Sequence, residues 1–125
     1  MMILARTLWG EARGLGREGM YNVACVIRNR VYDERWPSDW EEVCLQRWQF
    51  SCWNFSDPNY FRVQNVTTED KEFREAILLA FRFVHEKPAD VTNGCNHYHS
   101  HAVEPYWAVG KDVDFQDEGH LFYKL

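Results

Sequence analysis

Residues 17–31, with the sequence REGMYNVACVIRNRV, decide the fold class of this chain. Their apolar side chains recur at i, i+3, i+4, i+7 and i+11, the spacing that places them on one face of an α-helix. The residues on this face are Met20, Val23, Ala24, Ile27 and Val31. The pattern therefore predicts an amphipathic helix that packs against a core.

Further helical patterns lie on both sides of this segment. Before it, residues 2–13 place Leu4, Leu8 and Ala12 on one face, and this helix is expected to end at Gly14 and Gly16. After Pro37, Ser38 followed by Glu41 resembles a capping box for a short helix that ends near Gln46. Its inward residues are expected to be Trp40, Val43 and Cys44.

A long helix is predicted in the second half of the chain. Thr67 or Thr68 is suited to cap its N-terminus, and Pro88 ends it. Its expected inner face consists of Phe73, Ala76, Ile77, Ala80, Phe81 and Val84. Residues 47–66 show no sustained period and are expected to form loops, with at most one short extended piece.

The C-terminal region, from residue 95 onward, is expected to be irregular or extended. A chain of 125 residues is long enough for one hydrophobic core and too short for two. We therefore expect a mainly α (α+β) fold with few short strands, organised as a single domain over residues 1–125.

Charge and composition exclude several classes of function. Fourteen Lys and Arg against 19 Asp and Glu give a net charge of -5, so binding to nucleic acid is not expected. Arg6 and Glu11 interrupt the apolar N-terminus before a secretory or membrane-spanning length is reached, so no stable membrane association is expected. The four cysteines lack a CxxC pair and have apolar neighbours, which favours reduced core residues.

Glu11 is the first candidate for chemistry. Around the axis of the first helix it lies about 20° from Leu4, so it extends the apolar stripe of Leu4 and Leu8. In the last turn of that helix, the negative end of the helix dipole and partial burial both raise the pKa of a carboxyl group. A general acid needs such a pKa. The alternative is a Glu11 side chain that turns to solvent or pairs with an arginine such as Arg6 or Arg13.

The segment HYHSH offers a second kind of site. If this segment is extended, His97, His99 and His101 lie on one face, where alternating imidazoles can bind zinc and His120 could complete the site. This makes a zinc-dependent amidase or peptidase an alternative. The spacing is less specific than an HExxH motif, and histidines beside Tyr98 can equally hydrogen-bond a polar ligand.

Aromatic residues are unusually abundant, with six Trp, six Tyr and eight Phe. Such rings combine apolar faces with polar tips and suit the faces and hydroxyl groups of a sugar chain. Most of them are expected in the core, and a few around Glu11 would suffice to line a groove. The candidates are Trp48, Phe50, Trp53, Phe55, Tyr60, Tyr98, Tyr106, Trp107 and Tyr123.

A hydrolytic glycosidase would need a second carboxylate beside Glu11. The acidic residues near the C-terminal end that could supply it are Asp112, Asp114, Asp117 and Glu118. A solvated acidic loop has the same composition, and this is the interpretation that we favour. Glu11 therefore has no convincing partner in the sequence.

Several motifs occur in one order along the chain. GEARG precedes an apolar helix that ends in NRV, and WP, QFSCW, HYH, PYW and GHLFY follow. In this combination the chain resembles the cell wall hydrolases related to the spore cortex-lytic enzymes, known as the SleB-like family. The resemblance runs nearly end to end, and GEARG and GHLFY are its most specific parts. It implies a small lysozyme-like, mostly helical catalytic domain that cleaves the glycan strand of peptidoglycan.

The same resemblance implies roles for individual residues. Glu11, the glutamate of GEARG, is expected to be the catalytic acid and base. Other positions match the family's loop after the third helix and its C-terminal motifs, and they are expected to line the substrate cleft. These are Gln49, Phe50, Ser51, Tyr98, His99, Trp107 and His120. No metal ion or other cofactor is expected.

Two mechanisms suit such an enzyme. In a lytic transglycosylase, Glu11 protonates the glycosidic oxygen between N-acetylmuramic acid and N-acetylglucosamine and then acts as base on the muramic 6-hydroxyl, without a second carboxylate. A hydrolytic muramidase normally uses a second Asp or Glu to handle water. Because Glu11 lacks a partner, the transglycosylase is favoured. A muramidase, the zinc enzyme and a non-catalytic glycan-binding module are the alternatives.

The expected setting is bacterial cell lysis. Spore enzymes of this type often carry a signal peptide and an added wall-binding module, whereas this chain resembles a bare bacteriophage or prophage endolysin. We expect a monomer that is synthesised in the cytoplasm without a signal peptide. It would reach the cell wall after the membrane is permeabilised.

Overall fold

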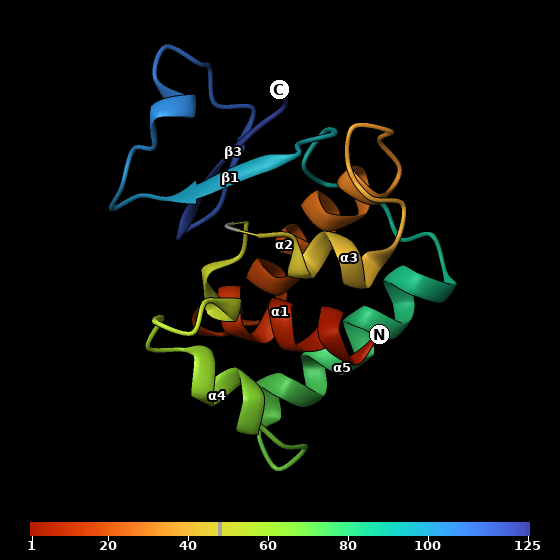
Figure 1. The fold of residues 1–125 in the computed structure, drawn as a ribbon. Helices are drawn as coiled ribbons and strands as arrows, with labels where there is room; N and C mark the ends of the chain where they lie inside the picture. Colours follow the sequence, from red (N-terminus) through yellow and green to blue (C-terminus); the bar gives the residue numbers. More distant parts are fainter. Residues whose placement is uncertain (48) are drawn as a thin grey trace.

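The computed structural model describes residues 1–47 and 49–125, and Trp48, one of the candidate groove residues, lies outside the described part. The chain forms a mainly helical domain with one small antiparallel sheet, which confirms the expected fold class. Figure 1 shows the helices as one body and the sheet as a cover at one end of it. The C-terminus lies beside the sheet, and the N-terminus lies among the helices.

Helices α1 (Met2–Ala12) and α2 (Gly16–Val31) form the centre of the molecule. A short 3-10 helix at Arg13–Leu15 joins them, so the break predicted at the glycines is a tight turn. Gly16 has a φ of 69°, a left-handed value that glycine adopts without steric cost. The turn folds α2 back against α1, and both pack against the long helix α5 (Lys71–His85).

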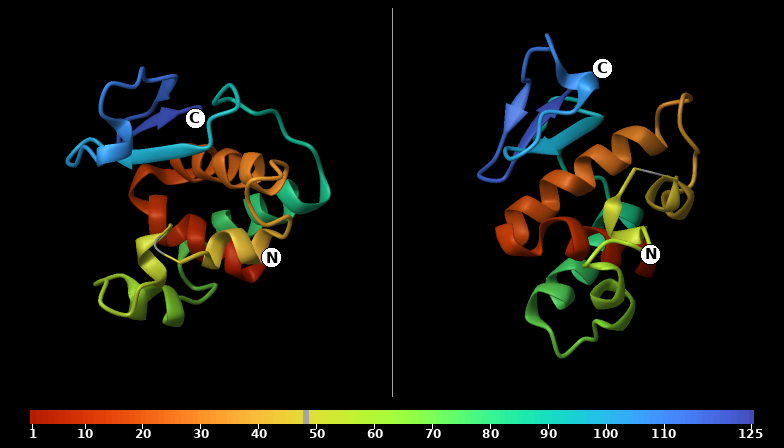
Figure 2. Two further views of the ribbon diagram at one scale, coloured as in Figure 1. Left: turned by 45° about the horizontal axis from the view of Figure 1, so that its top comes forward. Right: turned by 60° about the vertical axis from the view of Figure 1, so that its left-hand side comes forward.

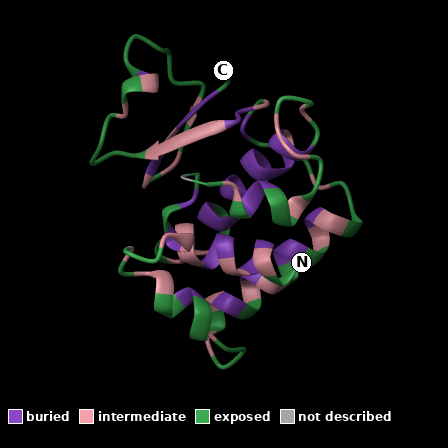
Figure 3. Ribbon diagram, viewed as in Figure 1, coloured by how far each residue is buried: buried purple, intermediate pink, exposed green. Residues whose placement is uncertain are grey.

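Helix α2 is buried on more of its circumference than the one-faced pattern predicts. Met20, Val23 and Ile27 belong to the main core and are fully buried. Val26 is also fully buried, in a second cluster with Phe122 of the sheet. Figure 3 shows this helix almost entirely in the colour of buried residues. The sheet therefore covers the side of α2 that a two-layer helical protein would expose.

Helix α5 begins at a different cap from the one expected. The carboxylate of Asp70 accepts hydrogen bonds from the backbone N–H of Phe73 at 2.9 Å and from the indole of Trp9 at 3.0 Å. Asp70 thus caps the helix and ties it to α1, and the expected cap at Thr67 or Thr68 is wrong.

The inner face of α5 also differs in part from the predicted one. Phe81 was expected in the core but is 50% exposed. It follows the buried Ala80, and one step along a helix turns the side-chain direction by about 100°, which takes Phe81 out of the buried stripe. Ile77 and Val84 are partly buried. The fully buried residues of this face are Phe73, Ala76, Leu79, Ala80 and Phe83.

Two short helices lie between α2 and α5. Helix α3 (Trp40–Leu45) is capped by Asp39, whose carboxylate accepts from the backbone N–H of Glu42, one residue later than the expected Ser38 cap. Helix α4 (Tyr60–Asn65) lies in a region expected to be loops, so that expectation is wrong.

The position of α4 depends on tertiary contacts. Arg6 of α1 donates to the backbone carbonyls of Val63 and Val66 at the end of α4. A helix of this length is unstable in isolation, so α4 depends on such contacts with the rest of the molecule. Periodicity within the sequence does not show these contacts and therefore did not reveal the helix. A 3-10 helix at Ser51–Trp53 precedes it.

The sheet consists of β1 (His97–Ser100), β2 (Phe115–Gln116) and β3 (His120–Tyr123). Its strands are antiparallel in the order β1-β3-β2, and Tyr98 pairs with Phe122. Two further views in Figure 2 show the sheet lying across α2. β1 thereby brings the HYHS sequence over the C-terminal end of α1.

All four cysteines are buried and free, as their apolar neighbours predicted. Burial raises the pKa of the Cys25 and Cys44 thiols to about 12, so these groups are uncharged at neutral pH.

Within the described residues, no helix is long and apolar enough to cross a membrane.

Candidate active site

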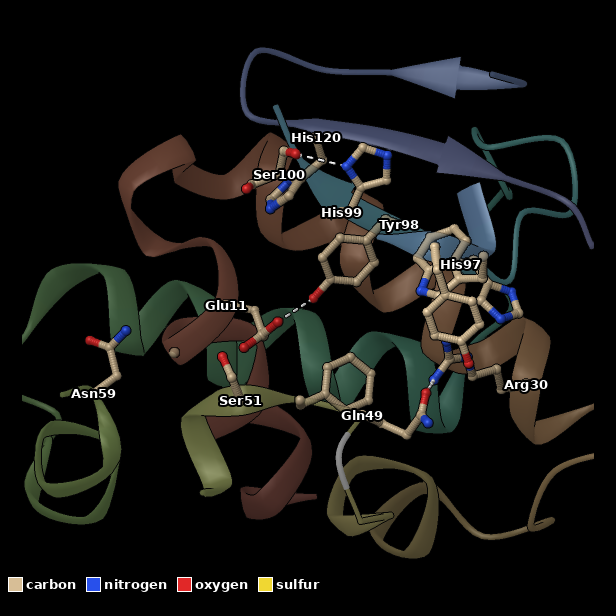
Figure 4. Close-up of a pocket in the computed structure, with 14 residues that line it drawn as sticks. Glu11, Arg30, Gln49, Ser51, Asn59, His97, Tyr98, His99, Ser100 and His120 are labelled. Carbon is tan, nitrogen blue, oxygen red and sulfur yellow. Dashed lines mark hydrogen bonds between the residues drawn. The ribbon is translucent and has the colours of Figure 1, made fainter. Parts of the chain in front are cut away.

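A cavity of about 760 Å³ lies between the helical body and the sheet. Figure 4 shows Glu11 near its middle, with Asn59 at one end and Arg30 and His97 toward the other. Side chains from α1, α2, the loop after α3, β1 and β3 meet here. The lining residues are Gly10, Glu11, Arg30, Gln49, Phe50, Ser51, Asn59, His97, Tyr98, His99, Ser100, Tyr106, Trp107 and His120.

Glu11 points into this cavity from the last turn of α1 (Figure 4). The alternative pairing with an arginine does not occur among the described residues. Arg6 donates to the carbonyl of Val63, and Arg13 donates to the side-chain oxygen of Asn59 at 2.7 Å. Glu11 is also the only carboxylate among the described residues that line the cavity.

The pKa of Glu11 is raised above its ordinary value, mainly because burial disfavours the carboxylate. Hydrogen bonds from the Tyr98 hydroxyl and from the thiol and backbone of Cys52 act in the opposite direction. The charge of Asp57 raises the pKa further. The direction of this shift agrees with the effect of burial that the sequence predicted for this carboxyl.

Gly10 determines how closely the neighbouring segments approach Glu11. A Cβ atom at this position would lie 2.8 Å from Cγ2 of Val63 and 2.9 Å from Sγ of Cys52. Such separations are shorter than van der Waals contact, so a larger residue would push α4 and the 51–53 segment away. The absent side chain lets Cys52 reach the carboxylate.

Tyr98 is the contact between the sheet and Glu11. Its hydroxyl donates to Oε1 of Glu11, and its ring packs against Phe122 and against the edge of His120, with ring centroids 5.6 Å and 4.8 Å away. Burial and the neighbouring carboxylate raise the pKa of Tyr98 well above 10. The phenol is therefore neutral and remains a hydrogen-bond donor to Glu11.

Arg30 occupies the end of the cavity away from Asn59. It is buried, with 5% exposure, and donates to the backbone carbonyl of Asn96 at 2.8 Å and to Oε1 of Gln49 at 2.9 Å. Burial lowers the pKa of its guanidinium to about 10, which still leaves it charged at neutral pH. These bonds hold the loop after α3 against the start of β1.

The histidines of β1 have separate surroundings. Burial and the charges of Arg30 and Arg35 lower the pKa of His97 to about 4, so this imidazole is neutral at pH 7. His99 stacks on Tyr123, with ring centroids 5.4 Å apart, and Nε2 of His99 lies 2.8 Å from the hydroxyl of Tyr123. Trp107 contacts the rings of both histidines and closes this side of the cavity.

His120 is held by the turn before β3. Asp117 accepts hydrogen bonds from the backbone N–H groups of His120 and Gly119 at 2.8 Å and 3.0 Å, and from the side chain of Asn22 of α2 at 3.0 Å. Burial lowers the pKa of His120. Asp117 is therefore a structural residue of this turn and not part of a solvated acidic loop.

None of the acidic residues considered as a second carboxylate lies in the cavity lining. Asp117 has the structural role just described, and Asp114 accepts from the backbone N–H of Lys124 at 2.7 Å. Asp112 and Glu118 are exposed to solvent.

The histidines do not form the zinc site considered from the sequence. Among the described residues, no three His, Cys, Asp or Glu side chains converge on a point where they could hold a metal ion. His101 lies beyond the end of β1 and approaches the backbone carbonyl of Asp117 at 3.2 Å. The geometry of the donors thus gives the amidase alternative no support.

Glu11 and the seven cleft residues implied by the family resemblance all line this cavity, as does His97. Of the aromatic groove candidates, Phe50, Tyr98, Tyr106 and Trp107 line it, whereas Trp53, Phe55, Tyr60 and Tyr123 do not. The contact of the lining residues with a glycan stays a prediction. Sequence reasoning missed Gly10, Arg30, Asn59 and Ser100. Arg30 stands beside Asn29 and Arg28 at the end of this helix, so the sequence did not single it out. Nothing in the sequence marked Asn59 either.

The fold is similar to two solved catalytic domains. That of the SleB protein of Bacillus cereus has a TM-score of 0.73 and 22% identity, and the likeness covers 98% of this chain and 88% of that domain. The catalytic domain of SleB from Bacillus anthracis, described as a germination-specific lytic transglycosylase, has a TM-score of 0.74 and 22% identity, with 98% and 92% covered. At this identity the likeness shows the fold alone.

A family model described as Cell Wall Hydrolase matches residues 14–123. The chain therefore belongs to the cell wall hydrolase family, whose substrate is the peptidoglycan wall. The match begins after Glu11, so the role of this residue depends on the geometry of the cavity. No curated protein matches the chain. These comparisons give the expected bacteriophage origin no support.

Proposed function

We propose that this cell wall hydrolase is a lytic transglycosylase. It would cleave the β-1,4 bond between N-acetylmuramic acid and N-acetylglucosamine, with Glu11 as the acid and then the base. The observation that carries the proposal is a half-buried carboxyl with a raised pKa that is alone among the described residues of the cavity lining. When a hydroxyl group of the substrate itself acts as the nucleophile, one carboxyl that serves as acid and then as base is sufficient.

The first step uses the protonated form of Glu11. The carboxyl donates its proton to the glycosidic oxygen, the bond from that oxygen to C1 of the muramic residue breaks, and positive charge develops on the sugar ring. The raised pKa of Glu11 keeps the proton available for this transfer. The N-acetylglucosamine residue leaves with a free 4-hydroxyl.

The second step uses the carboxylate that remains. Glu11 accepts the proton of the muramic 6-hydroxyl as that oxygen bonds to C1, which closes a 1,6-anhydro ring and restores the protonated acid. Between the steps, the Tyr98 hydroxyl and Cys52 stabilise the carboxylate by hydrogen bonds. Neutral His97 adds no competing acid at pH 7.

One observation favours a hydrolytic muramidase as a second candidate. Asp57 lies close enough for its charge to raise the pKa of Glu11, although it does not line the cavity. Oδ1 of Asp57 accepts from the backbone N–H of Asn59 at 2.8 Å, which indicates a structural role in the loop. In a muramidase, Asp57 would have to position the attacking water.

The substitution Glu11→Gln tests the role of the carboxyl. The amide is nearly isosteric, so the fold should remain, while release of soluble fragments from purified peptidoglycan should fall by about 10² or more. Glu18→Gln, on an exposed turn of α2, is the matched control and should retain activity. A folded Glu11→Gln variant with near-normal release would remove Glu11 from the mechanism.

A role in cell lysis is part of the same proposal. The protein would act on the wall after the membrane is permeabilised. The family supports the wall as substrate.

A further inference from the structure

Three aromatic rings form an exposed cluster at the start of α4. Phe55, Tyr60 and Phe61 contact one another, with ring centroids 5.4 to 5.8 Å apart. Phe55 is 74% exposed and Phe61 is 60% exposed. Large aromatic side chains gathered on the surface are costly in water and mark a binding surface more often than scattered single rings do.

The cluster adjoins the end of the cavity at Asn59. Asn59 lines the cavity and directly precedes Tyr60 at the start of α4. Its side-chain oxygen accepts from Arg13 at 2.7 Å, and its backbone N–H donates to Asp57 at 2.8 Å. The segment that carries the rings is therefore anchored, and in Figure 4 it leads outward from the side of Glu11 opposite to Arg30.

The surroundings of the rings indicate a sugar chain as the occupant. Residues 54–61, NFSDPNYF, offer amide, hydroxyl and carboxylate groups beside an apolar surface. They contain no Lys or Arg, although Arg62 follows them and Arg13 is bonded to Asn59. Sugar rings present C–H faces to aromatic rings and hydroxyl groups to such polar groups. An anionic membrane surface would call for a cluster of about four to eight basic residues, whereas residues 54–62 contain Arg62 alone.

We infer that Phe55, Tyr60 and Phe61 form an outer subsite for the glycan strand, beyond the cavity on the Asn59 side. The inference rests on the proposed function. A strand that passes Glu11 would continue past Asn59 and place a further sugar residue on the exposed faces of Phe55 and Phe61. The subsite would favour long strands over fragments that fill only the cavity.

Binding to insoluble peptidoglycan tests the subsite in the full chain. In the Glu11→Gln background, which holds the strand without cutting it, Phe55→Ser with Phe61→Ser should weaken co-sedimentation about 10-fold. In the active chain, the same pair should raise KM for long strands by a similar factor. Phe81→Ser is the matched control, since Phe81 is 50% exposed on α5 and absent from the cavity lining. Thermal unfolding of each variant checks the fold.

The outcomes separate the subsite from the proposed function. Weaker binding in the Phe55 and Phe61 variant alone supports the subsite. Equal affinity and equal KM in all variants, with Glu11-dependent cleavage intact, overturn the subsite and leave the function standing. A dimer that light scattering finds in the parent and not in the variant, with unchanged glycan affinity, assigns the cluster to self-association instead. A parent chain that neither binds nor cleaves peptidoglycan overturns both.

Discussion

At the scale of single residues, opposite influences act on the carboxyl group of Glu11. Burial in the cavity raises its pKa and is the largest influence, whereas hydrogen bonds from Tyr98 and Cys52 lower it. An acid catalyst needs the first effect, and the base formed after proton transfer needs the second. The arrangement thus suits one group that changes role within a turnover.

The substitution Tyr98→Phe should change the pH profile of wall cleavage. The lost hydroxyl stabilises the carboxylate, so its removal raises the pKa of Glu11 and moves the alkaline limb of activity to higher pH. Turnover should fall about 10-fold because the carboxylate loses one charge-assisted hydrogen bond.

The control for this experiment is Tyr32→Phe, because Tyr32 is 67% exposed and does not line the cavity. Cleavage rates measured across pH for both variants and the parent provide the comparison. An alkaline limb that stays in place, or that moves to lower pH, in the Tyr98 variant would contradict the assigned hydrogen bond.

The substitution Asp57→Asn distinguishes the two glycosidase mechanisms. It removes a charge that raises the pKa of Glu11, so the alkaline limb should move to lower pH. The amide oxygen can still accept from the backbone of Asn59, and below the alkaline limb cleavage should stay within about 10-fold of the parent. Asp112→Asn, at an exposed position, serves as the control. A loss of about 10² in the Asp57 variant alone would favour a muramidase.

At the scale of the elements, the contact of α1 with the 51–53 segment and α4 depends on Gly10. Gly10→Ala should lower the free energy of unfolding by about 1 to 3 kcal/mol, because the new methyl group overlaps Val63 and Cys52. Gly14→Ala is the matched control and should not create a steric overlap, since nothing lies within 4 Å of a Cβ atom at this position. Denaturant unfolding of both variants measures the free energy of unfolding. Equal values for the two variants would contradict the steric role of Gly10.

Helical periodicity predicted α1, α2 and α5 because each buries a continuous stripe that local sequence spacing reveals. The capping bond of Asp70 to the backbone N–H of Phe73 is local, but Thr67 and Thr68 are also suitable caps by residue type, and the bond from Trp9 that fixes Asp70 comes from another helix. The helix α4 was missed for a similar reason, since Arg6 supports its end from α1. The strands were not assigned because each is short, and because β1 pairs with β3, which lies far along the chain, with His97 opposite Tyr123.

The candidate site was predictable where a residue conflicts with its local pattern. Glu11 stood out as a carboxylate on an apolar stripe, whereas the cleft residues came from motifs of a known family. Arg30 and Asn59 were not found, because their place in the cavity results from the packing of α2 and of the loop before α4. Gly10 is informative only once its neighbours Val63 and Cys52 are known.

At the scale of the whole molecule, the cavity exists because the sheet lies across the helical body (Figures 1 and 2). The N-terminal helix supplies the carboxyl, and a strand near the C-terminus supplies its hydrogen-bond donor, Tyr98. Trp107 and Tyr106 line one side of the cavity, and the proposed subsite at α4 would extend the other. A glycan strand lying in this cleft would pass Glu11 between two aromatic surfaces.

The chemical nature of the cleaved ends distinguishes a lytic transglycosylase from a muramidase. Purified peptidoglycan is digested with the protein, and the released muropeptides are separated. Their masses are measured by mass spectrometry and compared with those from a muramidase digest. We expect 1,6-anhydro-muramic ends, lighter than the hydrolysed ends by the mass of one water, because the muramic 6-hydroxyl replaces water as the nucleophile. Reducing muramic ends alone would exclude the proposed transglycosylase reaction.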